Sequence, residues 1–288
     1  MERLRDELRG PALALGVDCA LTRGKMAERG PRLIVSDVDS TFIRGEAIDM
    51  LADAAGSGPR VAAITEAAMN GELDFAEALA ERVATLEGLS VDRVESIADS
   101  IEPVPGAETL VATAHARGCA VGLVSGGFIE VIGGLARRLG VDCVLANRLE
   151  TSDGALTGRT EGEIVTRERK AEALRRWSEG GRLPGTDLPG GSDSPKGSNL
   201  PEDSDPPLEA RGRESADARS RGFPSPRERI DLSETVAAGD GANDLSMMEI
   251  AGLSVAVCAK PAVLAAADAA VTRPRLDILA AILGWDAV

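Results

Sequence analysis

Two aspartates separated by a single residue, Asp37 and Asp39, directly follow an aliphatic run in the segment LIVSDVDSTFIRGEAID (33–49). Two like charges about 4 Å apart repel by roughly 4 kcal/mol at an effective dielectric near 20, so the pair needs a cation, a proton or full solvation. A carboxylate fixed at a strand end can attack phosphorus to form an aspartyl-phosphate, and a second one beside it can protonate the departing oxygen. Asp37 is therefore a candidate nucleophile and Asp39 a candidate general acid and base, although an isolated Asp-x-Asp more often caps a turn.

A second acidic segment, AAGDGANDLSMM, follows another aliphatic run and places Asp240 and Asp244 among glycines that permit close approach of the backbone. Several carboxylates gathered at one sheet edge require a hard divalent cation. Oxygen-only ligands together with a phosphate substrate indicate Mg²⁺. Such an ion would neutralise the aspartates and the phosphate together.

The segment GLVSGGF carries Ser125, Gly126 and Gly127 at another expected strand end, where a hydroxyl and free backbone N–H groups can hold phosphate oxygens. An ordinary glycine turn is the alternative. A serine hydrolase is disfavoured, because Leu123 replaces the first glycine of G-x-S-x-G and no histidine follows the serine. The G-x-x-x-x-G-K-[ST] loop of nucleotide triphosphatases is also absent from the sequence.

The elements that must position these residues are short aliphatic runs alternating with helical patterns. Runs of this length without polar alternation are typical of strands covered on both faces. We expect strands at 33–35, 120–124, 141–146, 235–238, 254–257 and 270–272, and helices at 106–118, 128–140 and 243–252. This alternation predicts an α/β fold with a Rossmann-like, doubly wound parallel sheet, in which ligands bind at the carboxyl ends of the strands.

Two stretches depart from that alternation. Residues 49–104 show helical periodicity without strand runs and predict a small α-helical cap inserted in a catalytic core of residues 31–48 and 105–288. The Gly/Pro/Ser-rich stretch 180–229 has few aliphatic residues, so we expect a disordered insertion within the core. Residues 1–30 form an N-terminal extension in which one helix carries Leu4 and Leu8.

Within the expected cap, the helix at 74–86 has one apolar stripe: Phe75, Leu79, Val83 and Leu86. Arg82 falls at the edge of this stripe, next to Phe75. An arginine in an apolar setting requires an anion, and its planar guanidinium suits a carboxylate bidentately. An internal salt bridge is the alternative.

Composition excludes several classes of protein. The chain of 288 residues is 43% hydrophobic, which is enough for a large core, and its net charge of −15 argues against a nucleic-acid partner. No apolar stretch approaches the roughly 20 residues of a membrane-spanning helix, so we expect a soluble, cytoplasmic protein without a membrane partner; a homodimer is left open. The lone His115 and four scattered cysteines give no zinc or disulfide framework.

Taken together, DVDSTFIRGEAID, VSGGF, Lys170 and GDGANDLSMM resemble the four motifs of the haloacid dehalogenase superfamily, in the family's order. They are most similar to its phosphoserine phosphatase branch over residues 33–178 and 231–284. Ser36, before the first aspartate, departs from the apolar residue usual in that branch. The resemblance implies a helical cap, a Mg²⁺ requirement, and hydrolysis of O-phospho-L-serine as the last step of L-serine biosynthesis.

The resemblance also implies a role for each matching position. Asp37 would be nucleophile and metal ligand, Asp39 acid and base and a metal ligand through its carbonyl, and Asp240 the remaining metal ligand. The phosphoryl oxygens would be held by Ser125, the Gly126 amide, Lys170 and Asn243. Glu46 would bind the substrate ammonium and Arg82 its carboxylate. Supporting positions would be Asp244, Gly127, Met69 and Phe75.

Two alternatives stay open. One is a related phosphatase or phosphotransferase of the superfamily that acts on another small phosphomonoester, such as phosphohomoserine or a phosphosugar. The other is a non-catalytic phosphoserine-binding protein that keeps the fold. The intact set of Asp37, Asp39, Lys170 and Asp240 disfavours the second.

Overall fold

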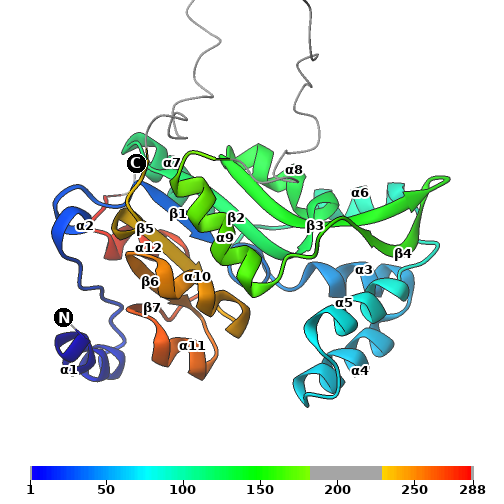
Figure 1. Ribbon diagram of the computed structural model, residues 1–288, viewed down its shortest axis with the longest axis horizontal. Coiled ribbons are helices and arrows are strands. Elements are labelled where there is room, and N and C mark those ends of the chain that lie inside the picture. Colours follow the sequence, from blue (N-terminus) through cyan, green and yellow to red (C-terminus); the bar gives the residue numbers. More distant parts are fainter. Residues whose placement is uncertain (1, 182–228, 287–288) are drawn as a thin grey trace, which may run out of the picture.

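The computed structural model describes residues 2–181 and 229–286, and most of the insertion expected at 180–229 lies outside that part of the chain. Its centre is a seven-stranded sheet with the strand order β4-β3-β2-β1-β5-β6-β7 (Figure 1). In chain order the strands are β1 Leu33–Ser36, β2 Ala120–Phe128, β3 Cys143–Ser152, β4 Ala155–Glu161, β5 Thr235–Gly239, β6 Leu253–Val257 and β7 Ala269–Val271.

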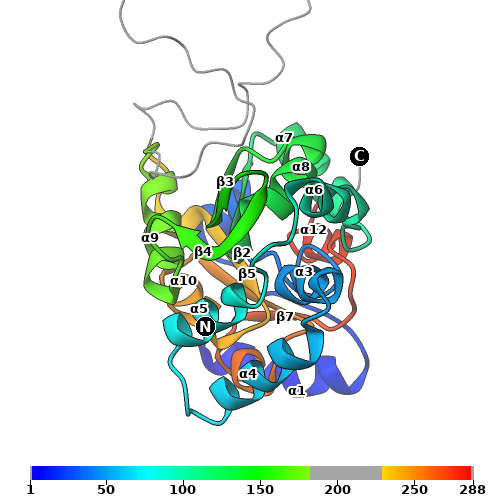
Figure 2. The ribbon, with the colours of Figure 1, turned by 90° about the vertical axis from the view of Figure 1, so that its right-hand side faces the viewer.

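Helices cover both faces of this sheet (Figure 2). They are α1 Glu2–Ala14, α2 Gly24–Arg29, α3 Ala47–Ala55, α4 Gly58–Met69, α5 Phe75–Ala84, α6 Val91–Ser100, α7 Ala107–Ala116, α8 Ile129–Leu139, α9 Arg167–Ser178, α10 Leu245–Ile250, α11 Pro261–Ala266 and α12 Asp277–Ile282, with the 3-10 turns η1 Leu232–Glu234 and η2 Ala242–Asp244. No helix of the described residues is long and apolar enough to cross a bilayer.

Successive residues of β1 supply two separate cores, one on each face of the sheet. Ile34 points into the larger core, with α7 and α8, whereas Leu33 and Val35 point into the core under α9, α10 and α11. All four residues of β1 are buried, as a strand covered on both faces requires. The doubly wound architecture predicted from the aliphatic runs is confirmed.

The edge strand β4 is a feature that the predicted all-parallel sheet lacks. β3 continues beyond the expected 141–146 to Ser152, turns at Asp153 and Gly154, and pairs antiparallel with β4. Along β3 the burial alternates after the first three residues, because one face of the hairpin meets the core and the other meets solvent. The sheet is therefore mixed, with one antiparallel strand at its edge.

Residues 47–100 fold into α3, α4, α5 and α6, and we propose that they are the cap expected at 49–104. The segment before α6 pairs with the hairpin, where Gly88 donates to Leu156 O (2.9 Å) and Val91 to Gly154 O (2.9 Å). The expected N-terminal helix is α1, on which Leu4 and Leu8 are exposed. The helix expected at 243–252 divides into η2 and α10.

Candidate active site

Asp37 lies immediately after β1 and is almost fully buried, at 3% exposure. Its backbone N–H donates to Ala238 O (2.8 Å), which fixes the loop after β1 against the end of β5. Its carboxylate accepts a bond from Lys170 Nζ, which lies 2.5 Å from Oδ1. The preceding Ser36 hydroxyl donates to Asp37 O (2.7 Å), so this unusual buried polar residue has a partner.

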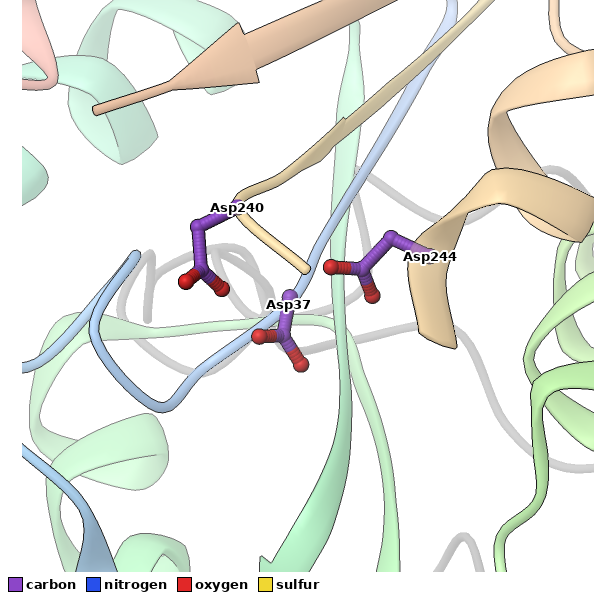
Figure 3. Close-up of side chains that lie close together, drawn as sticks. All are labelled: Asp37, Asp240 and Asp244. Atoms are coloured by element: carbon purple, nitrogen blue, oxygen red, sulfur yellow. The ribbon is translucent and has the colours of Figure 1, made fainter. Parts of the chain in front are cut away.

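Three carboxylates converge beside this strand end, and their nearest oxygens lie within 4.8 Å of one another: Asp37, Asp240 and Asp244 (Figure 3). Asp240 follows β5 and Asp244 ends η2, so strands adjacent in the sheet bring the cluster together. An oxygen-only set of carboxylates is the chemistry that hard divalent cations prefer. The cluster therefore fits such an ion.

Burial and mutual repulsion act on these carboxyl groups. Burial raises the pKa of Asp37 well above its ordinary value, and the charge of Asp244 raises it further, although Lys170 opposes both. Burial, followed by the charge of Asp244, also raises the pKa of Asp240. A positive charge placed among these groups would lower both pKa values.

Lys170 is the buried counter-charge of the cluster. It lies on α9, whose N-terminus is capped by the Thr166 side chain, and its Nζ donates to both Asp37 Oδ1 and Asp244 Oδ1 (2.7 Å). Burial alone would lower the pKa of Lys170, but the two carboxylates more than offset this and raise it. The lysine therefore stays charged at neutral pH.

The Asp39 carboxylate bonds to the start of α3 and to Ser125. Its Oδ1 accepts from the backbone N–H of Ala47 (2.7 Å), the first residue of α3, and its Oδ2 accepts from Ser125 Oγ (2.8 Å). Ser125 Oγ in turn accepts from Gly127 N (2.7 Å). A Cβ atom at Gly127 would lie 2.7 Å from Asp39 Oδ2, so a larger residue there would displace this carboxylate.

Asn147, which the motifs did not single out, links the loop around Gly126 to the start of α9. Its Nδ2 donates to Gly126 O (2.8 Å), and its Oδ1 accepts from Val165 N (2.8 Å), just before the N-cap of the helix that carries Lys170. Asn147 is 2% exposed. It therefore braces two segments that carry Gly126 and Lys170, to which the resemblance assigns phosphate binding.

A cleft of ≈ 150 Å³ opens above Asp37 and lies between the core and α5. Glu46 and Arg82 both line it, as do Phe75 and Asn243. Burial raises the pKa of Glu46 and lowers that of Arg82, and the attraction between their charges opposes the shift of the arginine. Glu46 Oε1 accepts from Ser40 Oγ (2.8 Å), and Arg82 Nε donates to Ala78 O (3.1 Å).

The predicted site residues divide into two layers. Those that line the cleft are Asp37, Asp39, Glu46, Phe75, Arg82, Gly126, Gly127, Asp240 and Asn243. Ser125, Lys170 and Asp244 are fully or almost fully buried and bond to residues that line the cleft. The Met69 side chain lies outside the described part of the structure.

The model of the haloacid dehalogenase-like hydrolases matches residues 34–195, more than half of the chain. The chain belongs to the haloacid dehalogenase-like hydrolases. A second model of haloacid dehalogenase-like hydrolases matches residues 226–277, which include Asp240 and Asp244. The two matches thus contain the acidic loops that form the cluster of this hydrolase.

Curated relatives of this hydrolase include several phosphoserine phosphatases. The phosphoserine phosphatase SerB2 of Mycobacterium tuberculosis is 42% identical over 93% of this chain, and the phosphoserine phosphatase of Lactococcus lactis is 39% identical over 84%. The chain spans 54% of the length of the first relative and 89% of the second. It also spans 58% of the phosphoserine phosphatase of Streptomyces coelicolor, which is 41% identical.

Solved structures of phosphoserine phosphatases are also similar to this hydrolase. A phospho-aspartyl intermediate analogue of a phosphoserine phosphatase superposes with a TM-score of 0.65 at 34% identity and covers 88% of this chain and 99% of that one. A substrate-bound phosphoserine phosphatase complex gives the same TM-score and identity, with 88% and 98% covered.

Proposed function

We propose that this hydrolase is a phosphoserine phosphatase, which converts O-phospho-L-serine to L-serine and phosphate as the last step of L-serine biosynthesis. The observation that carries the proposal is the juxtaposition in one cleft of the Asp37 carboxylate with Glu46 and Arg82. A phosphoryl acceptor thus faces one acidic and one basic handle. That combination matches a substrate that carries a phosphate, an ammonium and a carboxylate group.

The substrate binds with its phosphoryl group toward Asp37 and its amino-acid end toward α5. Glu46 pairs with the ammonium and Arg82 with the carboxylate, while Phe75 offers an apolar surface at the cleft. Ser125, the amide of Gly126, Lys170 and Asn243 hold the phosphoryl oxygens. Donors fixed in a buried site stabilise the charge that spreads over these oxygens during transfer.

In the first step an oxygen of Asp37 forms a bond to phosphorus, and the bond between phosphorus and the serine oxygen breaks. Asp39 gives its proton to the departing serine oxygen. In the second step Asp39 takes a proton from a water molecule, whose oxygen attacks phosphorus and releases phosphate and the free carboxylate of Asp37. The Ala47 N–H orients Asp39 for both transfers through its bond to Oδ1. The single proton of the Ser125 hydroxyl, which here goes to Asp39 Oδ2, turns to a phosphoryl oxygen when the substrate binds.

Mg²⁺ is the ion that we propose for the acidic cluster, held by Asp37, Asp240 and the backbone carbonyl of Asp39. When bound, it supplies positive charge that offsets the phosphate and the carboxylates together. Asp244 is not a ligand in this proposal, since its two oxygens accept from Lys170 and from Gly241 N (3.1 Å). Cytoplasmic location and a homodimer stay predictions.

A comparison of substrates with matched variants tests the assignment. We expect phosphoserine to be preferred over phosphohomoserine, a phosphosugar and an aryl phosphate in the presence of Mg²⁺. Replacing Arg82 by alanine should lower kcat/KM for phosphoserine about 100-fold, because the carboxylate clamp is lost, and leave aryl phosphate hydrolysis nearly unchanged. Equal losses on both substrates would contradict the role of Arg82, and a preference for a substrate without the amino-acid group would contradict the assignment.

A further inference from the structure

Lys260 reaches the active-site edge of the sheet from a strand that the motifs do not include. It lies three residues beyond the end of β6 and is the N-cap residue of α11. β6 pairs in parallel with β5, and the backbone N–H of Lys260 donates to the carbonyl of Asp240 (3.1 Å). This bond fixes the loop after β6 to the loop that carries Asp240 of the acidic cluster.

The charges that line the cleft are unbalanced. Four carboxylates line it, and the cations among its described lining residues are Arg82 and Lys260. Arg82 comes from α5, whereas Lys260 comes from the core, beside Asp240 and Asn243. Lys170 is buried, so it acts on a phosphoryl group that has already reached Asp37 and not on an anion that is still approaching the cleft.

A phosphomonoester carries two negative charges near neutral pH and must approach this acidic cleft. We propose that Lys260 is a positioning residue, whose charge attracts the phosphoryl group toward Asp37 and weakens the hold of the carboxylates on the divalent cation. The proposal rests on the phosphomonoester chemistry proposed above, but not on phosphoserine as the substrate. The charge of Lys260 also lowers the pKa of Asp240, against the larger effects of burial and Asp244.

The charge of Lys260 should act in opposite directions on anion affinity and on cation affinity, so its removal can be distinguished from a loss of structure. Replacing Lys260 by glutamine should weaken anion binding and tighten divalent cation binding, since a cation beside Asp240 repels another cation. A disturbed loop would weaken both. Lys260 is exposed, so the substitution removes charge without opening a cavity.

The test uses the full chain with inorganic phosphate and Mg²⁺ as probes. Inhibition of aryl phosphate hydrolysis by phosphate gives the anion affinity, and calorimetric titration with Mg²⁺ in phosphate-free buffer gives the cation affinity. Lys25→Gln is the matched control, because Lys25 is also an exposed lysine next to carboxylates, Asp231 (3.4 Å) and Glu234 (3.6 Å), and it does not line this cleft. Lys260→Arg preserves the charge.

We expect Lys260→Gln to weaken phosphate inhibition about two- to fivefold at low salt and to tighten Mg²⁺ binding by a similar factor. The effect on phosphate should shrink between about 0.01 M and about 0.15 M ionic strength, as the Debye length falls from about 30 Å to about 8 Å. Lys260→Arg and Lys25→Gln should resemble the unmodified chain. Unchanged phosphate inhibition in Lys260→Gln, weaker binding of both ions, or equal effects in Lys25→Gln would overturn the proposal.

Discussion

The Ser40 hydroxyl donates to the carboxylate of Glu46 across 2.8 Å, from a residue whose backbone has a positive φ of 58°. Ser40 directly follows Asp39, so the turn after the first motif also orients the proposed ammonium ligand. A non-glycine residue in this region of φ is uncommon and costs some free energy. The hydroxyl contact gives a reason for serine at a position whose backbone favours glycine.

Replacing Ser40 by glycine removes the hydroxyl that orients Glu46 and keeps a residue that tolerates the positive φ. Glycine adopts positive φ readily, so the free energy of unfolding should not fall. We expect kcat/KM for phosphoserine to drop about tenfold, because a hydrogen bond to a charged group contributes roughly 1.5 kcal/mol, and kcat/KM for an aryl phosphate to stay within about twofold. Loss on the aryl phosphate as well would show that Ser40 acts on the phosphoryl chemistry instead.

Asn147 should affect the phosphoryl site regardless of the substrate. In Asn147→Asp, an ionised carboxylate presents an acceptor to the carbonyl of Gly126, whereas the protonated form regains a donor. Burial raises the pKa of such a carboxyl group, so its deficit in kcat relative to the unmodified chain should shrink as the pH falls. Asn147→Ala is the control, and its deficit of about tenfold should not depend on pH. A pH-independent deficit in Asn147→Asp would contradict the brace to Gly126.

His115 contributes to stability away from the active site. Its Nε2 lies 2.9 Å from Asp142 Oδ2, which also accepts from Val121 N (2.7 Å). The hydrogen bond to Asp142 raises the pKa of His115, with burial opposing. The stabilisation is therefore fully present below the unfolded value of about 6.5 and is lost as the pH rises through the folded pKa.

The corresponding measurement compares His115→Gln with the unmodified chain by denaturant unfolding. We expect the variant to be less stable by up to about 1 kcal/mol near pH 5.5, after screening by solvent, and the difference to shrink toward pH 9. At each pH, the folded variant and the unmodified chain should have the same activity at saturating phosphoserine. A difference in stability that grows with pH would contradict the pairing with Asp142.

The sequence was sufficient to predict that Asp37 and Asp240 converge, because both follow buried parallel strands and such strands end at one sheet edge. The 4.8 Å cluster that includes them confirms this convergence. Lys170 could not be placed in the same way. It lies on a helix beyond the β3–β4 hairpin, so only resemblance to a family, and then the bond to Asp37, connects it with the site.

The features that the sequence did not reveal depend on contacts between distant segments. The partners of Asn147 are Gly126 and Val165, and Lys260 meets Asp240 through its backbone, so neither carries a local signal. The strand β4 was missed for another reason, since its alternating, largely polar sequence lacks the aliphatic run used to find the other strands. A search for alternation around the Asp153-Gly154 turn would have found the hairpin.

The central claim is that Asp37 accepts the phosphoryl group, and trapping the covalent intermediate tests it most directly. With an aryl phosphate, whose leaving group needs no proton, the Asp39→Asn variant should form the intermediate but hydrolyse it slowly. Acid quenching of this reaction, followed by peptide mapping, should find one phosphoryl group on Asp37, and none in Asp37→Asn, which should release no phosphate. A phosphoryl group on another residue, or continued turnover by Asp37→Asn, would contradict the account.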